Sequence, residues 1–360
     1  MVALLQRPLR SGVSRPRSGY RPSPRLCRLA PVSSSRPLPL VLLAGGSRRF
    51  EVLPDGKAVT ESDRAALAGY KAIDLRIGGR PVIELGVRRF RSSPVFSPIY
   101  IAGPEKLYAD LDLGDVRFVD TDGDFGTNLQ NATEAIHAEH PDAMIAYSTA
   151  DVLPDPGELA TAVADFERHR PCDFWMLECR VPEDPSRLGE SAWKPRYRIT
   201  GDGDSTPVET LPGHLVVADP RAVRRRFTYQ IFDLAYGTRN LPIPRRTWKI
   251  TVGLGARFWQ AEMEEIRHGR RPTVVWDVLV HGFGFAFELW RGIHHTRMED
   301  RIRRIFVHRR HRRTYPRRRG RVAVLHALSL AKDVDTAEEA RELELELGGS
   351  GADGKGGALE

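Results

Sequence analysis

The sequence predicts an α/β fold built on a doubly wound, mainly parallel sheet, with a helical insertion in its C-terminal part. Short apolar runs alternate with helical segments from residue 38 to about residue 180, which is typical of strands joined by crossover helices. The chain of 360 residues is 41% hydrophobic, enough apolar material for one large core. This composition disfavours disorder of the whole chain and a fibrous repeat.

The predicted elements follow one another regularly up to residue 180. The first strand is the apolar run 38–44, which ends at a glycine pair. Pro81 suits the first turn of a helix, and Asp155 is placed to cap another. Helices are then expected at 62–70, 81–90, 127–140 and 156–168, and strands at 98–102, 116–119, 143–149 and 174–178.

After residue 180 the alternation changes. The predicted elements there are strands at 197–200 and 214–218, a mostly helical insertion at about 220–300, a last strand at 322–328 and an acidic helix through residue 346. We therefore expect three parts: a basic disordered extension over residues 1–38, an α/β domain over 39–347 that includes the helical insertion, and a disordered glycine-rich tail over 348–360.

The net charge of +8 is concentrated in limited stretches. Residues 1–50 hold ten Arg and no acid, so the remaining 310 residues carry 45 basic against 47 acidic side chains. The body of the chain is thus near neutral, which disfavours nucleic acid as its partner. A second basic run, 301–321, holds eleven Arg and no acid. We expect it to be a solvated face or to lie near an acidic substrate, with RNA or an anionic membrane as the alternative partner.

Cysteine usage and hydropathy favour a cytoplasmic protein. Cys27, Cys172 and Cys179 lack the CxxC spacing of a zinc site and are expected to be free thiols in a reducing compartment. No run reaches the roughly 20 apolar residues that a membrane span needs. Peripheral membrane contact stays open because of an aromatic run that is otherwise expected to form a core helix. The run consists of Trp276, Phe283, Phe285, Phe287 and Trp290.

A glycine turn after the first strand is the first candidate site. It is formed by Leu43, Ala44, Gly45 and Gly46 and is followed by Arg48, Arg49 and later Lys71. Glycine lets the backbone approach a phosphate closely, and the cationic side chains would offset the charge of a triphosphate. The alternative is a plain turn. No GK[ST] follows, so this is not a Walker A motif.

Acidic residues after two other strands are the second candidate. Asp151 directly follows a strand and is placed to hold Mg²⁺, which prefers oxygen ligands. Asp333 or Asp335 would supply a second carboxylate. The loop 122–128, which ends in Asn128, enters a helix whose amides could meet a base or a phosphate. For each of these features the alternative is a turn or a helix cap.

Four motifs in this order resemble the molybdenum cofactor guanylyltransferase-like family of nucleotidyltransferases. The motifs are LAGG at 43–46, YKAIDLRIGGRPVI at 70–83, STADVLP at 148–154 and DVDTAEE at 333–339. The resemblance implies a glycosyltransferase-A-like fold that binds an NTP and Mg²⁺. It places Gly45 and Gly46 at the phosphates, Arg49 and Lys71 as charge-offsetting groups, Asn128 near the base or ribose, and Asp151 and Asp335 at the metal.

The chain departs from the family pattern at three points. The spacing from glycine to arginine is one residue short, so Arg48 and Arg49 compete for one role. The gap before Lys71 is long, and Ala150 stands where the family often has glycine. These departures bear on the prediction of the acceptor substrate more than on the prediction of NTP binding.

The implied reaction moves an NMP from an NTP onto a phosphorylated acceptor, a small molecule or a lipid, and releases pyrophosphate. One alternative is a glycosyltransferase that uses a nucleotide-sugar on the same fold. That class typically presents Asp-x-Asp at a central strand end, where this chain has Asp151 alone. The other alternative is a protein that binds phosphates, RNA or membranes without catalysis.

Overall fold

The structure, a computed structural model, describes residues 38–45, 70–184, 186–189, 195–237 and 271–350, with shorter pieces at 253, 255, 257–263, 266–267 and 269. The extension predicted over 1–38 lies outside these residues except for Leu38, which already belongs to the first strand. The helix predicted at 62–70 also lies outside them, apart from Tyr70, which is not helical.

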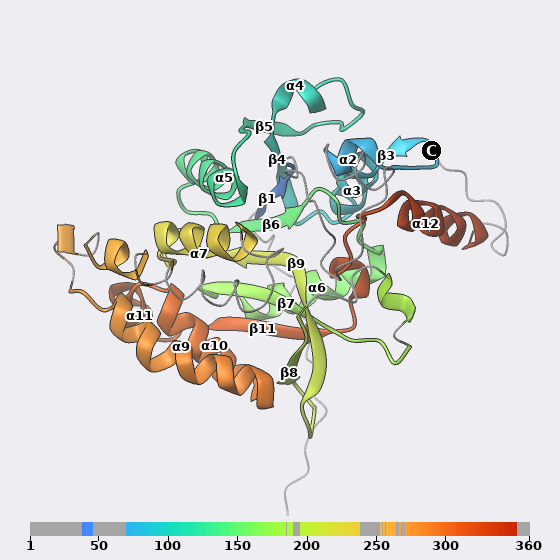
Figure 1. Cartoon of the computed structure of the whole chain (residues 1–360). Coiled ribbons are helices and arrows are strands. Elements are labelled where there is room, and N and C mark those ends of the chain that lie inside the picture. Colours follow the sequence, from blue (N-terminus) through green and yellow to red (C-terminus); the bar gives the residue numbers. More distant parts are fainter. Residues whose placement is uncertain are drawn as a thin grey trace, which may run out of the picture. The chain divides into compact units, whose positions relative to one another are not determined.

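The first half of the chain forms the parallel part of a nine-stranded sheet (Figure 1). Its strands are β1 (Leu38–Leu43), β4 (Phe96–Gly103), β5 (Arg117–Asp120) and β6 (Ile145–Thr149), paired in the order β6-β1-β4-β5. All of these pairs are parallel. The apolar sequence of β1 suits its central place, because a strand covered on both faces needs no polar side. These strands confirm the prediction within a few residues at each end.

The helix predicted at 156–168 begins where its capping residue predicts, whereas the helix predicted at 127–140 begins two residues earlier, at Phe125. In α6 (Pro156–His169) the carboxylate of Asp155 accepts hydrogen bonds from the backbone N–H groups of Gly157 and Glu158 at 2.8 and 3.0 Å. In α5 (Phe125–Glu139) Asp124 accepts from Thr127 N–H at 2.8 Å. Shorter elements complete this half: α2 (Lys71–Asp74), β2 (Arg76–Ile77), β3 (Arg80–Pro81), α3 (Val82–Arg91) and α4 (Glu105–Tyr108).

The second half extends the sheet through one long antiparallel strand. This strand, β9 (Val208–Ala218), pairs with β6 on one side and with β7 (Phe174–Arg180) and β8 (Tyr197–Thr200) along its length. Two parallel pairs finish the sheet: β11 (Gly320–Leu325) on β7, and β10 (Ile293–His294) on β8. The sheet is therefore mainly parallel, with β9 as its antiparallel link.

Two strand predictions need correction in this half. The strand predicted at 214–218 is too short, because β9 already begins at Val208. The strand predicted at 322–328 ends three residues early, and Leu328 belongs to a 3-10 turn, Leu328–Leu330. Pairing with a neighbouring strand determines where a strand ends, and a single sequence does not show the neighbour.

The predicted helical insertion is confirmed where the structure describes it. Its helices are α7 (Arg225–Gly237), α9 (Val274–Arg291) and α10 (His295–Phe306), and α11 (Arg309–Thr314) follows. The last helix, α12 (Ala337–Ser350), runs past Gly348, so the tail predicted to be disordered from residue 348 is helical up to Ser350. The Glu- and Leu-rich sequence before Gly348 favours helix strongly enough to continue through two glycines.

The core lies on both faces of the sheet, as a doubly wound fold requires. Leu40, Leu42 and Ile101 face the larger cluster, which also contains α3 and α6 side chains. Val41 and Tyr100 face the opposite way and pack beneath α5. This alternation along β1 and β4 confirms the α/β fold class and leaves the carboxyl ends of the strands to form a site.

Candidate functional site

The glycine turn lies between the ends of two neighbouring strands. Leu43 pairs with Thr149, and Ala150 N–H donates to the Leu43 carbonyl at 3.1 Å. On the other side, Ala44 N–H donates to the carbonyl of Ala102 at 2.8 Å. The residues 43–45 therefore lie directly beside the segment that carries Asp151, at the edge where ligands bind in open α/β sheets.

Asn128 comes from a distant part of the chain and lies against this turn. A Cβ atom placed on Gly45 would be 2.4 Å from Asn128 Nδ2, so only glycine fits here. Asn128 is 3% exposed, and its Oδ1 accepts hydrogen bonds from Thr121 Oγ1 at 2.8 Å and Gly123 N–H at 2.9 Å. The N-cap of α5 is Asp124, so Asn128 is not a capping residue. Asn128 holds the loop against the glycine turn.

Three carboxylates meet at the end of β6. One oxygen from each of Asp151, Asp333 and Asp335 lies within 4.8 Å of the others. Val334 N–H donates to the Asp151 carbonyl at 2.9 Å, which joins the two segments and sets the two aspartates on either side of Val334 beside Asp151. The structure thus brings together the two predicted metal ligands, and Asp333 joins them.

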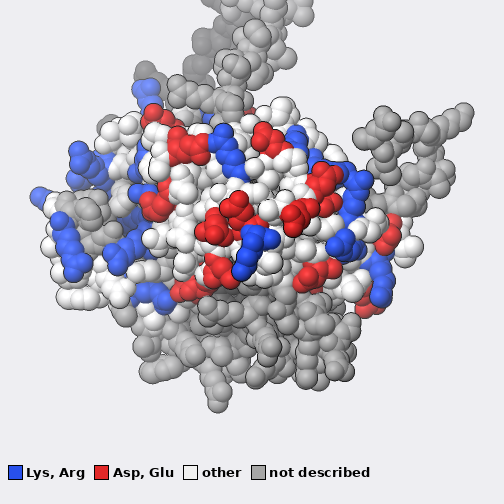
Figure 2. Space-filling model, turned by 90° about the horizontal axis from the view of Figure 1, so that it is seen from above, with Lys and Arg blue, Asp and Glu red and all other residues white. Residues whose placement is uncertain are grey.

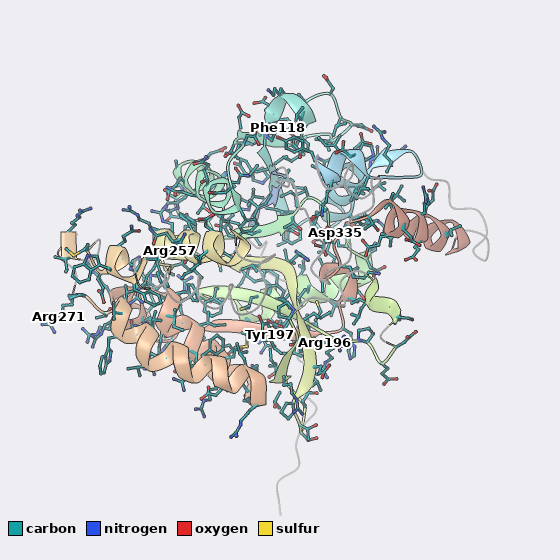
Figure 3. All side chains as sticks on the ribbon, viewed as in Figure 1. Phe118, Arg196, Tyr197, Arg257, Arg271 and Asp335 are labelled. Carbon is teal, nitrogen blue, oxygen red and sulfur yellow. The ribbon has the colours of Figure 1, made fainter. Side chains whose placement is uncertain are left out.

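The start of α12 shows that Asp335 is not merely a cap. Thr336 Oγ1 accepts from Glu339 N–H at 3.2 Å, and the Glu339 carboxylate accepts from Asp335 N–H at 2.8 Å. These two side chains serve the helix end in the manner of a capping box. The Asp335 side chain lies just before α12 (Figure 3) and takes part in the carboxylate cluster.

Lys71 is the cation of this cluster. Its Nζ lies 2.6 Å from Asp335 Oδ1, and both side chains are largely buried. Burial raises the pKa of Asp335, the nearby Asp333 raises it further, and Lys71 acts in the opposite direction. The sequence predicts that Lys71 meets a triphosphate. The structure places Lys71 in an ion pair with Asp335, a member of the carboxylate cluster.

Asp151 carries the strongest indication of a cation site. Burial and then the charge of Asp333 raise the pKa of its carboxyl group. Its Oδ1 is buried and has no hydrogen-bond partner among the described residues. A buried oxygen without a partner is unfavourable. A hard divalent cation, which binds carboxylate oxygens, would supply the missing interaction.

His214 is a neighbour of the cluster that the sequence did not reveal. It lies on β9, with Nδ1 3.4 Å from Thr149 Oγ1 and Nε2 4.0 Å from Asp333 Oδ1. The antiparallel pairing of β9 with β6 brings it there. The sequence feature that could have indicated His214 is its position at the start of the predicted strand 214–218.

Some predicted site residues cannot be placed. Gly46, Arg48 and Arg49 lie outside the described residues. The other predicted residues all lie on the segments described above, at the same edge of the sheet. These are Leu43, Ala44, Gly45, Lys71, Asn128, Asp151 and Asp335.

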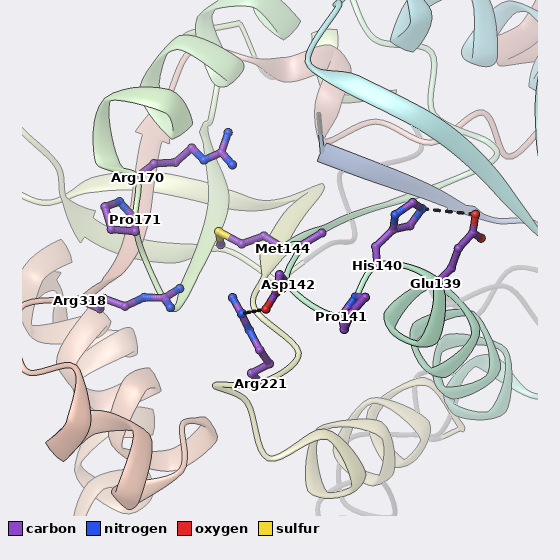
Figure 4. A pocket seen from close by; sticks show the side chains of 10 residues that line it. Glu139, His140, Pro141, Asp142, Met144, Arg170, Pro171, Arg221 and Arg318 are labelled. Atoms are coloured by element: carbon purple, nitrogen blue, oxygen red, sulfur yellow. Dashed lines mark hydrogen bonds and ion pairs between the residues drawn. The ribbon is translucent and has the colours of Figure 1, made fainter. Parts of the chain in front are cut away.

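A separate pocket of about 470 Å³ lies at the opposite edge of the sheet (Figure 4). Met144 and Pro171 line it just before β6 and β7 begin, so it is remote from the strand ends that carry the carboxylates. Its arginines already have acidic partners: Arg221 lies 2.8 Å from Asp142, and Arg318 lies 2.9 Å from Asp219. We therefore place no part of the site there.

No family model and no curated protein matches the sequence. Among solved structures, a hypothetical transferase from Thermus thermophilus is similar with a TM-score of 0.49 and 18% identity, over 84% of this chain and 99% of that one. CMP:2-keto-3-deoxy-manno-octonic acid synthetase complexed with CTP has a TM-score of 0.43 and 11% identity, over 87% and 99%. For 4-diphosphocytidyl-2C-methyl-D-erythritol synthase from Anaerococcus prevotii the values are 0.38 and 10%, over 87% and 98%. These scores and identities are too low to assign a family or an activity to this chain.

Proposed function

We propose that this chain is a Mg²⁺-dependent nucleotidyltransferase that moves an NMP from an NTP onto a phosphorylated acceptor. The observation that carries the proposal is the cluster of Asp151, Asp333 and Asp335 with Lys71, next to the glycine turn at the carboxyl edge of the sheet. Catalysis of phosphoryl and nucleotidyl transfer depends on this combination of oxygen ligands and cationic side chains.

The glycine turn is the proposed site of the phosphates. Gly45 has no side chain to block the space beside Asn128, and backbone close to a phosphate can aim N–H groups at it. Asn128 holds the loop 121–128 in place beside the turn, which supports its proposed position near the base or ribose. Arg48 and Arg49 keep the role that the sequence resemblance implies, which is to offset phosphate charge.

The carboxylate cluster fits Mg²⁺ in its chemistry. Its donors are all carboxylate oxygens, and Asp151 Oδ1 has no other partner among the described residues. Bound there, Mg²⁺ would neutralise charge on the triphosphate and its leaving pyrophosphate. Lys71 orients Asp335 through their ion pair and adds a positive charge beside the same position.

The reaction needs positioning more than it needs a protein nucleophile. An oxygen of the acceptor phosphate attacks the α-phosphorus in line, and the bond from that phosphorus to the pyrophosphate oxygen breaks. An acceptor phosphate is already ionised at neutral pH, so no general base has to remove a proton. The side chains of the site bind and align the two reactants and offset the developing charge.

A screen for pyrophosphate release tests the proposal. Each of the four NTPs is incubated with Mg²⁺ and a panel of phosphorylated sugars, small metabolites and short-chain lipid phosphates. We expect one combination to release pyrophosphate and to yield a product heavier than the acceptor by one NMP residue (NMP less water), in a reaction that EDTA stops. Release of NDP from a nucleotide-sugar, with no NTP turned over, would instead identify a glycosyltransferase.

A further inference from the structure

The arginine-rich segment 301–321 divides into two groups in the structure. Six of its eleven arginines form ion pairs with carboxylates of the described residues. These are Arg301, Arg303, Arg304, Arg312, Arg318 and Arg321. The first group is structural. The other five are exposed, and none has a carboxylate partner within the described part of the chain. They are Arg309, Arg310, Arg313, Arg317 and Arg319.

Exposed apolar side chains lie on α9 and on the helical piece that adjoins it. On α9, Trp276 is 69% exposed and Val280, one turn later, is 44% exposed. Trp259 is 67% exposed, in the helical piece 257–263. That piece adjoins the start of α9, because Glu262 Oε1 accepts from Val275 N–H at 2.7 Å. Large exposed apolar side chains grouped in this way are typical of an interaction surface.

An ion pair joins the apolar and basic groups. Arg312 of α11 lies 3.2 Å from Asp277, the residue that follows Trp276. Arg309, Arg310 and Arg313 lie within one helical turn of Arg312. Figure 2 shows Lys and Arg along both side margins of the upper face, with Asp and Glu gathered between them. We call Trp259, Trp276, Val280, Arg309, Arg310 and Arg313 the basic-aromatic surface.

The inner side of α9 belongs to the core and is not available for docking. Phe285 packs with Met298 of α10 and with Val322 of β11, and Val278 packs with Phe227. The prediction of a core helix is thus correct for this side of α9, while Trp276 shows that the other side is open. The side chains of Phe283, Phe287 and Trp290 lie outside the description.

We propose that the basic-aromatic surface docks the protein on an anionic membrane. Tryptophan prefers the boundary between headgroups and acyl chains, and arginines next to it are attracted by anionic lipids. A polyanion without an apolar phase, such as RNA, would use the arginines but would give Val280 no partner. No helix within the described residues is long and apolar enough to cross a membrane, so the contact is peripheral.

The docking surface and the carboxylate cluster share no residue. The surface is formed by α9, α11 and the piece 257–263, none of which supplies a residue to that cluster. The proposal is therefore independent of nucleotidyl transfer, and each can fail without the other.

Vesicle flotation tests the docking. The full chain is mixed with vesicles of phosphatidylcholine alone or with added phosphatidylserine, at low and physiological salt. We expect binding only to the vesicles with phosphatidylserine. The triple variant Arg309→Glu/Arg310→Glu/Arg313→Glu should bind at least about a hundredfold more weakly, since each arginine contributes roughly a fivefold factor in affinity. Trp276→Ser should weaken binding by about tenfold through lost apolar burial.

A charge-matched control separates this surface from net charge. Arg187→Glu/Arg196→Glu/Arg198→Glu changes the net charge by the same amount as the first triple variant. Its three exposed positions lie outside the basic-aromatic surface, so binding to vesicles should stay near normal. Thermal melting of each variant verifies folding. Absence of flotation with phosphatidylserine, or equal loss in both triple variants, would overturn the proposal. A third outcome would also overturn it: no binding to vesicles, together with binding to an RNA oligonucleotide that is lost in Arg309→Glu/Arg310→Glu/Arg313→Glu and is unchanged in Trp276→Ser.

Discussion

At the scale of single residues, Asp151 gives the most direct test of the site. Asp151→Asn keeps the shape of the side chain but removes the charge that a cation needs. We expect Mg²⁺-dependent pyrophosphate release to fall by at least about a hundredfold. Asp155→Asn is the matched control, because asparagine caps a helix as well as aspartate does and turnover should stay normal. Near-normal turnover of Asp151→Asn would contradict the metal assignment.

Lys71 tests the proposed role of a positive charge beside the triphosphate. Lys71→Gln removes its ion pair with Asp335, which spans 2.6 Å. We expect the NTP KM to rise or kcat to fall by roughly tenfold, the effect of one lost charge-assisted contact. The control Lys106→Gln alters an exposed lysine of α4 and should leave both constants unchanged. Steady-state kinetics at saturating Mg²⁺ distinguishes the two variants.

Glu178 predicts a pH dependence of stability. It is buried on β7, Thr210 Oγ1 donates to its Oε2 at 3.0 Å, and burial raises the pKa of its carboxyl group to about 8. The folded state therefore holds the proton at pH values where the unfolded state has lost it. The stabilisation is complete below the unfolded pKa and is lost as pH rises through about 8.

The variant Glu178→Gln imitates the protonated side chain at every pH. We expect its Tm to equal or fall slightly below that of the parent at about pH 5 and to exceed it by a few degrees at about pH 9. Glu209→Gln, at an exposed position of β9, should show no such crossing. Parallel Tm curves for Glu178→Gln and the parent across this range would show that Glu178 is ionised in the folded protein.

At the scale of elements, a buried ion network connects the helical insertion to the sheet. Asp173, just before β7, is fully buried and accepts from Arg303 Nε of α10 at 2.6 Å. His311 and Arg318 approach the same carboxylate at 3.2 and 3.3 Å. The network thus joins α10, α11 and the chain that enters β11 to the start of β7.

Removing the central charge of this network should weaken the whole attachment. We expect Asp173→Asn to lower the free energy of unfolding by about 3 kcal/mol or more, because it leaves buried arginines without a counter-charge. Asp300→Asn breaks the exposed pair with Arg304 and should cost less than about 1 kcal/mol. Urea unfolding measures both. Equal effects would show that the buried pairs are no more important than the exposed one.

How far the sequence predicts these elements depends on how local the signal is. The strand β1 and the helices α5 and α6 are predictable because an apolar run or an N-cap lies within the element itself. The limits of β9 and β11 are not, since pairing with β7 and β8 extends β9 back to Val208, and pairing with β7 sets the extent of β11.

The same reasoning applies to the site. Asp151 and Asp335 follow strands and belong to recognisable motifs, so both were predictable. Asp333 is the alternative to Asp335 in the same motif, and the hydrogen bond from Val334 N–H to the Asp151 carbonyl brings both of them beside Asp151. His214 is brought there by the antiparallel course of β9, a consequence of chain topology that residue type and spacing do not express.

At the scale of the whole molecule, metal binding should stabilise the fold. The cluster exists only when the segments after β6 and after β11 are together, so a cation that binds it favours the folded state. We expect Tm to rise with Mg²⁺ concentration, and to rise further when the NTP is added. NaCl at matched ionic strength is the control. A Tm that responds equally to both salts, or a full Mg²⁺ effect in Asp151→Asn, would contradict the expectation.

The contact between Lys71 and Asp335 has a consequence during translation. The two residues lie 264 positions apart in the chain. At ribosomal speeds, Asp335 is added roughly 10 to 50 seconds after Lys71. Once residue 151 has been added, a nascent chain contains the glycine turn, Asn128 and Asp151, but it still lacks Asp333 and Asp335. The carboxylate cluster therefore becomes complete only after residue 335 has been added, and products of premature termination before residue 333 cannot assemble it.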